Sequence, residues 1–143
     1  MLTIQHLWNV TRQKLTCLVE APRSSKWEKL EREWKATHPN CVACGTNKNV
    51  QVHHCIPFDL RPDLELDKTN LISLCMNVGM DCHLMVGHGG DFHSYNKSVR
   101  IDAVHVMHAV AAHNMSRVQK LFQMIKESRL SMKGETNVQN NSL

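Results

Sequence analysis

The sequence predicts a small α+β domain built around a bound zinc ion, and three observations lead to that fold class. The 143-residue chain is 42% hydrophobic and only 5% aromatic, so its core is small and gains from a metal that links its loops. Residues 50–54 alternate like a strand, and residues 70–75 form a second short apolar run. Four cysteines flank these two runs: Cys41, Cys44, Cys75 and Cys82.

The other predicted elements are helices. Apolar residues at i, i+3 and i+7 predict a helix over about residues 26–37. A short helix is predicted to begin at residues 82–83 and to end near residues 87–90, and a long helix is predicted from about residue 99 or 100 to 128. We therefore expect an N-terminal arm at residues 1–22, a central domain at 23–100, a C-terminal helix at 101–130 packed on or beside it, and a disordered tail at 131–143.

The net charge of +4 is unevenly distributed along the chain. Residues 1–40 carry seven Lys/Arg and four Asp/Glu, which gives +3, and residues 101–143 carry five and three, which gives +2. Residues 41–100 carry five and six, which gives −1. If the central domain binds a polyanion, the attraction has to come from the flanks and from bound metal.

The N-terminus shows no basic segment followed by a long apolar stretch, so the sequence predicts no signal peptide. No run approaches the roughly 20 apolar residues that span a membrane, so no membrane partner is expected. Six cysteines could form disulfides in a secreted domain, but a reduced cytoplasm with thiolates on zinc fits the absence of a signal peptide better.

The cysteine spacing predicts a structural zinc site. Cys41-x2-Cys44 is typical of a zinc knuckle, whereas the second pair, Cys75-x6-Cys82, is separated by an unusually long loop. Zinc requires only that four sulfur atoms converge at about 2.3 Å from the ion. Two alternatives stay open: Cys55 replaces one ligand, or some of the cysteines are buried as small apolar side chains.

A second site is predicted from histidines and one asparagine. Adjacent strand residues point to opposite faces, so His53 and His54 are expected to have different roles, one as a metal ligand and the other as a free base. His83 follows a zinc ligand and is a second metal ligand, and the Asn70 amide is placed to bond across the loop before it. His88 is a candidate contact to the metal or to a phosphate. The alternative is that these histidines are incidental, since the chain contains ten.

These residues resemble the HNH endonuclease family, also called ββα-metal nucleases. The resemblance runs from about residue 23 to 102 and rests on Val52-His53-His54, Asn70-Leu71-Ile72 and Cys82-His83. The widely spaced second cysteine pair resembles the phage-type subgroup. By this resemblance, His53 and His83 occupy the positions of metal ligands and His54 that of the general base. Asn70 occupies the position of the asparagine that orients the base or braces the loop.

The resemblance implies a metal-dependent endonuclease that hydrolyses DNA phosphodiester bonds with water activated by a histidine. Its cofactors would be a structural Zn²⁺ and a catalytic Mg²⁺, Mn²⁺ or other divalent transition metal. Its partners would be DNA and, in a phage, DNA-packaging proteins, in the host cytoplasm. The alternatives are a non-catalytic zinc-ribbon module that binds nucleic acid or protein, an RNA or structure-specific nuclease, and an accessory nuclease of phage DNA packaging.

Overall fold

The computed structural model describes residues 21–132, which form a small α+β fold of helices and two hairpins. The predicted N-terminal arm lies outside the described residues except for its last two positions, and so does the tail from residue 133 onward. Within residues 21–132, no helix has the length and hydrophobicity needed to cross a membrane.

The central element is an antiparallel hairpin of β1 (Val50–His54) and β2 (Leu71–Cys75). Its first strand has the predicted bounds, and its second begins one residue later than predicted. A loop of residues 55–70 joins the strands and contains two 3₁₀ turns, η1 (Pro62–Leu64) and η2 (Lys68–Asn70). All five residues of β2 are buried, which agrees with its continuous apolar sequence.

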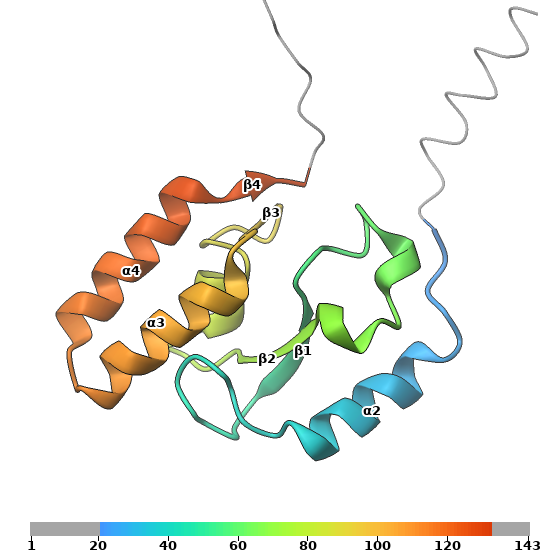
Figure 1. The fold of residues 1–143 in the computed structure, drawn as a ribbon, viewed down its shortest axis with the longest axis horizontal. Coiled ribbons are helices and arrows are strands. Elements are labelled where there is room, and N and C mark those ends of the chain that lie inside the picture. The colour runs from blue at the N-terminus through green and yellow to red at the C-terminus, as the bar shows by residue number, and fades with distance from the viewer. Residues whose placement is uncertain (1–20, 133–143) are drawn as a thin grey trace, which may run out of the picture.

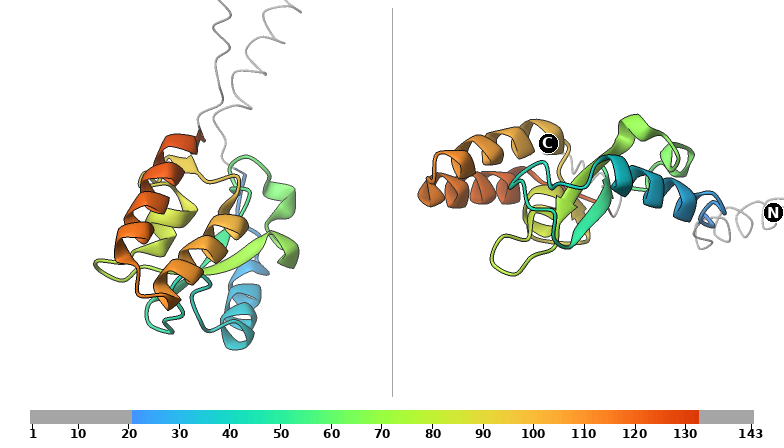
Figure 2. Two further views of the ribbon diagram at one scale, coloured as in Figure 1. Left: turned by 60° about the vertical axis from the view of Figure 1, so that its left-hand side comes forward. Right: turned by 90° about the horizontal axis from the view of Figure 1, so that it is seen from below.

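Helix α2 (Trp27–Thr37), which the apolar spacing of its residues predicts, lies beside the hairpin. The indole Nε1 of Trp34 donates a hydrogen bond of 3.0 Å to Ser73 Oγ. The same hydroxyl donates to the main-chain oxygen of His38 at 2.8 Å. Strand β2 therefore holds the C-terminal end of α2 through one buried serine. In Figure 1 and Figure 2, α2 and the two C-terminal helices lie at opposite ends of the molecule, with the hairpin between them.

The prediction of one long C-terminal helix is wrong. The structure has two antiparallel helices, α3 (Val99–Ala111) and α4 (Met115–Ser128), joined by a tight turn. His113 has a positive φ of 52°, and the Asn114 side chain caps α4 by accepting a hydrogen bond from the main-chain nitrogen of Arg117 at 2.9 Å. Because the chain reverses here, both helices can bury their apolar residues against the same core.

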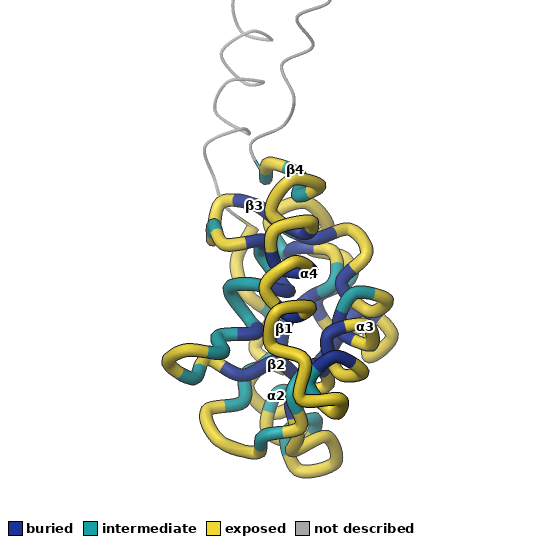
Figure 3. Tube along the Cα trace, turned by 90° about the vertical axis from the view of Figure 1, so that its left-hand side faces the viewer, coloured by how far each residue is buried: buried dark blue, intermediate teal, exposed yellow. Residues whose placement is uncertain are grey.

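The core lies where α3 and α4 meet the hairpin and the zinc-knuckle segment. Buried segments gather on this inner side, and the outer faces of the helices are exposed (Figure 3). The largest cluster of buried apolar residues contains Cys41, Ala43, Ile72, Leu74, Cys75, Cys82, Val86, Val99, Ala103, Val106, Ala109, Val118, Leu121, Phe122 and Ile125. Three of the four predicted zinc ligands belong to this core.

The predicted disordered tail begins too early. Residues of β4 (Leu130–Ser131) pair with β3 (Ser94–Tyr95) in a second antiparallel hairpin. The main-chain nitrogen of Met132 also donates to the oxygen of His93 at 2.9 Å. Residues 130–132 are therefore part of the fold, because their main chain pairs with residues 93–95.

Candidate functional site

The four predicted cysteines lie together. Their sulfur atoms are all within 4.8 Å of one another, and the Cys44 and Cys75 sulfurs are 3.6 Å apart. Sulfurs at the corners of a zinc tetrahedron lie roughly 3.8 Å apart, given a Zn–S bond of about 2.3 Å, so this cluster fits a structural zinc ion. Cys55 is half-buried and lies outside the cluster, so the geometry favours the original four.

Without a cation the cluster would hold several neutral thiols. Burial raises the pKa of the Cys44 thiol to about 12. A hydrogen bond with Cys41, and then burial, raise the pKa of the Cys82 thiol, whereas the same hydrogen bond lowers the pKa of Cys41 to about 5. Four clustered sulfurs that are costly to ionise together require a positive ion to make them thiolates, which is the role of zinc in such sites.

A second cluster consists of three histidines. His53 comes from β1, His83 begins η3 (His83–Gly87), and His88 directly follows η3. One ring nitrogen of each lies within 4.8 Å of the others. His53 Nε2 and His83 Nδ1 are buried without a hydrogen-bond partner. His88 Nδ1 bonds to the main-chain oxygen of Ser94 at 2.7 Å, which leaves its Nε2 for a ligand. Unpaired buried nitrogens that converge in this way fit a metal ion.

The geometry of η3 explains how His83 and His88 come together. In an α-helix, residues five apart point about 140° away from each other, since each residue turns the chain by about 100°. Here the segment is a π-helix, in which the main-chain nitrogen of His88 bonds to the oxygen of His83 at 3.2 Å. The wider turn brings i and i+5 onto one side, and such π turns are frequent at functional sites. His88 therefore joins the three-histidine cluster, which agrees with the first of the two roles considered for it.

The surroundings keep these three histidines neutral. Burial, followed by repulsion from His83 and His88, holds the pKa of His53 well below its ordinary value. Burial and then His88 lower the pKa of His83 to about 4, and burial lowers that of His88. Neutral imidazole is the form that binds metals, so at neutral pH an incoming ion has few protons to displace.

The cysteine cluster and the histidine cluster are joined through the main chain, because Cys82 and His83 are adjacent residues. The main-chain nitrogen of Leu84 bonds to the Asp81 carboxylate at 2.9 Å, as expected for a residue that caps the start of η3. A zinc ion on Cys82 would therefore fix the start of η3, the helix that begins at His83 and is followed directly by His88. Because the cysteine and histidine motifs are interleaved in the sequence, the structural zinc would also position the histidines.

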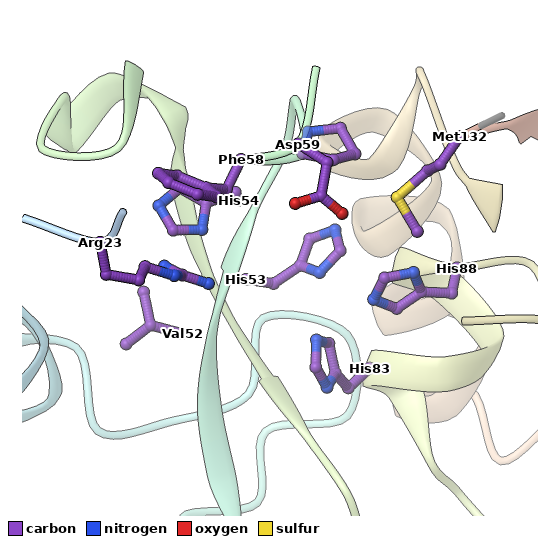
Figure 4. Close-up of a pocket in the computed structure, with 10 residues that line it drawn as sticks. Arg23, Val52, His53, His54, Phe58, Asp59, His83, His88 and Met132 are labelled. Carbon is purple, nitrogen blue, oxygen red and sulfur yellow. The ribbon is translucent and has the colours of Figure 1, made fainter. Parts of the chain in front are cut away.

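His54 is separate from the three-histidine cluster. It lies on the other side of β1 from His53, as the alternation of strand residues predicts (Figure 4). Its Nε2 bonds to the main-chain oxygen of Glu65 at 3.0 Å, and its ring lies against Trp27 with centroids 4.6 Å apart. A carbonyl oxygen only accepts, so Nε2 carries the hydrogen and Nδ1 keeps a lone pair. Burial lowers the pKa of His54, which leaves Nδ1 free as a base at neutral pH.

Asn70 braces the loop rather than touching His54. Its Oδ1 accepts from the main-chain nitrogen of Ile56 at 2.8 Å, and its Nδ2 donates to the oxygen of the same residue at 3.0 Å. This pair of bonds closes the loop of residues 55–70 two positions after His54. Of the two roles that the resemblance allows for Asn70, the geometry favours the bracing of the loop.

His54 and the three-histidine cluster line one open cavity of about 250 Å³. Figure 4 shows the imidazoles of His53, His83 and His88 facing one another, with the Asp59 carboxylate on their side of β1. Arg23 and Phe58 lie on the side of His54. The complete set of lining residues is Arg23, Val52, His53, His54, Pro57, Phe58, Asp59, His83, His88 and Met132.

No role was predicted from the sequence for several residues that shape this cavity. Glu65 is one of four acids in the loop, and nothing in its spacing indicates that it is buried and holds both Arg23 and His54. Gly87 precedes His88, and its missing side chain makes room for the ring of His53. These are contacts between distant segments, so only Gly87, as a glycine beside a candidate ligand, carried a local signal.

Comparisons with models of known protein families, with curated proteins and with solved structures find no match to this chain. Function therefore has to be inferred from the chemistry of the site. The donor sets are informative, because four thiolates suit zinc, whereas three imidazoles on a cavity wall suit a divalent transition metal that keeps positions open for a substrate.

Proposed function

We propose that this chain is a metal-dependent endonuclease of the HNH type, which hydrolyses phosphodiester bonds of DNA. One observation supports this function above the others. A neutral histidine with a free Nδ1, His54, lines the same cavity as three clustered imidazoles, two of which bury a ring nitrogen without a hydrogen-bond partner. A base beside a metal site in an open cavity is the inventory that phosphodiester hydrolysis requires.

Each group of residues at the site has a separate role in this reaction. His53, His83 and His88 would hold a divalent ion, which supplies positive charge to the phosphate and to the leaving oxygen. His54 takes a proton from the attacking water through Nδ1, while its bond to Glu65 fixes the ring and the tautomer. Asn70 holds the loop that provides this bond. The four cysteines and their zinc would fix the position of η3 relative to the hairpin.

The three-imidazole donor set favours Mn²⁺ or another first-row transition metal at the catalytic site over Mg²⁺, which prefers oxygen ligands and retains its water. Asp59 adds one carboxylate to the cavity wall, on the same side of β1 as the three histidines. DNA as the substrate follows from the resemblance, and the positive flanks of the chain agree with a polyanion.

The test is cleavage of supercoiled plasmid by the parent protein and by His54→Ala, with Mg²⁺, Mn²⁺, Co²⁺ or Ni²⁺. We expect the variant to cleave roughly 10²- to 10⁴-fold more slowly, the usual contribution of a general base, with an unchanged metal content. His105→Ala is the matched control, because this exposed histidine lies on α3 and does not line the cavity. Equal rates for His54→Ala and the parent would remove His54 as the base.

A non-catalytic zinc-ribbon module is the competing function, and the same assay addresses it. Salt-dependent DNA binding without cleavage by any of these ions would favour that module. The converging histidines argue against it, since a binding module gains nothing from burying two unpaired imidazole nitrogens.

A further inference from the structure

Among the residues that line the histidine cavity, Arg23 is the one permanently charged cation. Its side chain is about half exposed, at 52% of its full accessible area. The other charged lining residue is Asp59, and Figure 4 shows the two on opposite sides of β1, with Arg23 beside His54 and Asp59 above His53. An anion in this cavity would therefore be attracted to the side that holds His54.

Arg23 is held in place by groups that leave most of its donors free. Its Nη1 bonds to Glu65 Oε1 at 3.2 Å. The guanidinium carbon lies 4.5 Å from the ring centroid of Phe58 and 5.2 Å from that of Trp27. A guanidinium has five N–H groups, and within the described residues this contact with Glu65 is its one hydrogen bond. The side chain is therefore oriented in advance, which lowers the entropy lost when it binds a ligand.

Glu65 connects this arginine to His54. The carboxylate of Glu65 is buried and accepts from the main-chain nitrogen of Ser24 at 2.9 Å as well as from Arg23. The main-chain oxygen of Glu65 accepts from His54 Nε2. Glu65 thus holds both the Arg23 guanidinium and the His54 imidazole, and both side chains line the same cavity.

We propose that Arg23 binds a non-bridging oxygen of the DNA phosphate that lies in the cavity, and that Glu65 positions Arg23 for this contact. This inference rests on the proposed nuclease function, because it assigns a substrate contact within the same site. The planar fork of arginine matches a phosphate, and an arginine that is already stacked on two aromatic rings presents that fork at little cost.

The test measures DNA binding separately from cleavage. A short labelled duplex is titrated with metal-loaded protein in the His54→Ala background, where it is not cut, at several salt concentrations. Arg23→Ala is expected to weaken binding roughly 10- to 100-fold, as the loss of a charge-assisted hydrogen bond implies. It is also expected to reduce the slope of log Kd against log salt by about 0.9, the value of one phosphate contact.

Two further variants make the result decisive. Arg61→Ala removes an exposed arginine that also pairs with a carboxylate, that of Asp63, but does not line the cavity, and it should bind as the parent does. Arg23→Lys keeps the charge and the partner Glu65 but loses the planar fork, so it should bind with intermediate affinity and melt at the temperature of the parent.

Three results would overturn the inference. They are an unchanged Kd and salt slope for Arg23→Ala, an equal loss in Arg61→Ala, or a full loss in Arg23→Lys together with lower thermal stability, which would make Arg23 a structural tie to Glu65. The two proposals can also be separated. If the parent protein does not cleave DNA, but Arg23→Ala weakens binding and Arg61→Ala does not, the nuclease function is wrong and the phosphate contact is still supported.

Discussion

A β-carbon placed on Gly87 would lie 2.9 Å from Cε1 of His53, and 3.1 and 3.2 Å from the two nitrogens of the same ring. Side chains do not approach one another this closely, so any other residue at position 87 would displace His53. The imidazole of β1 therefore reaches the other two ligands only because η3 ends in a glycine. The three-histidine cluster depends on this contact between two elements that are distant in sequence.

Gly87→Ala is expected to weaken binding of Mn²⁺ or Ni²⁺ roughly 10- to 100-fold, the range for changes that misorient a metal ligand. Calorimetric titration of the zinc-loaded protein measures this affinity. Gly79→Ala is the control, because it meets no atom within 4 Å although its φ of +85° is strained. Equal losses in both variants would attribute the effect to a general disturbance of the fold instead of to the displacement of His53.

Cys75→Ser is expected to abolish zinc binding and cooperative folding. The free energy of zinc binding is about 10–16 kcal/mol in zinc-finger peptides. The free energy of unfolding of a whole domain is only about 5–15 kcal/mol, so losing the zinc can remove all of it. Zinc content by atomic absorption and thermal unfolding by circular dichroism check this. Cys55→Ser, a half-buried cysteine outside the cluster, should retain zinc. A Cys75→Ser protein that folds and cleaves normally would contradict a structural role for the cluster.

Asn70→Ala is expected to slow cleavage at saturating metal about tenfold and to lower stability. The substitution removes two hydrogen bonds to the main chain of Ile56, each with a net contribution of about 0.5–1.5 kcal/mol, and it loosens the loop that bonds His54. Single-turnover kinetics and urea unfolding measure the two effects. Metal affinity should be unchanged, because Asn70 lies outside the histidine cluster. A variant that instead loses metal would place Asn70 among the ligands.

The sequence predicted the parts of the fold that depend on local pattern. Alternation placed β1 at residues 50–54, and the spacing of apolar side chains placed α2 within one residue of its start. The cysteines were recognisable because zinc demands four sulfur ligands whatever the intervening loop. The reversal at Ala112–Asn114 was missed, because it contains neither glycine nor proline and follows an uninterrupted apolar run.

The candidate site was predictable to a similar extent. The convergence of His53 and His83 followed from the interleaved motifs, but the inclusion of His88 depends on a π turn that residue pattern does not reveal. The roles of Arg23 and Glu65 depend on contacts about forty positions apart in the chain. Such contacts join the segment that precedes α2 to the loop of residues 55–70, and the sequence carries no periodic signal for them.

The dependence of cleavage on pH is expected to reflect the lowered pKa of His54. Because burial lowers this pKa below the ordinary value of about 6.5, the base stays deprotonated at pH 6.5 and loses activity only as the pH falls further. Cleavage rates at saturating metal from pH 5 to 8 should show the midpoint of the acidic limb below 6.5. Metal content is measured at each pH, since protonation of the three ligands acts in the same direction. A midpoint above 6.5 with metal still bound would disagree with the buried environment of His54.

We expect the cysteines to retain a structural metal, and the histidines to hold a second, exchangeable metal that cleavage requires. Metal content and plasmid cleavage measured on one sample, during gentle removal and return of metal, test it most directly. We predict one zinc per chain that survives a mild chelator, no cleavage in that state, and full activity when one equivalent of Mn²⁺ or Ni²⁺ is returned. Full cleavage by the one-zinc protein, or none with any divalent ion, would contradict the claim.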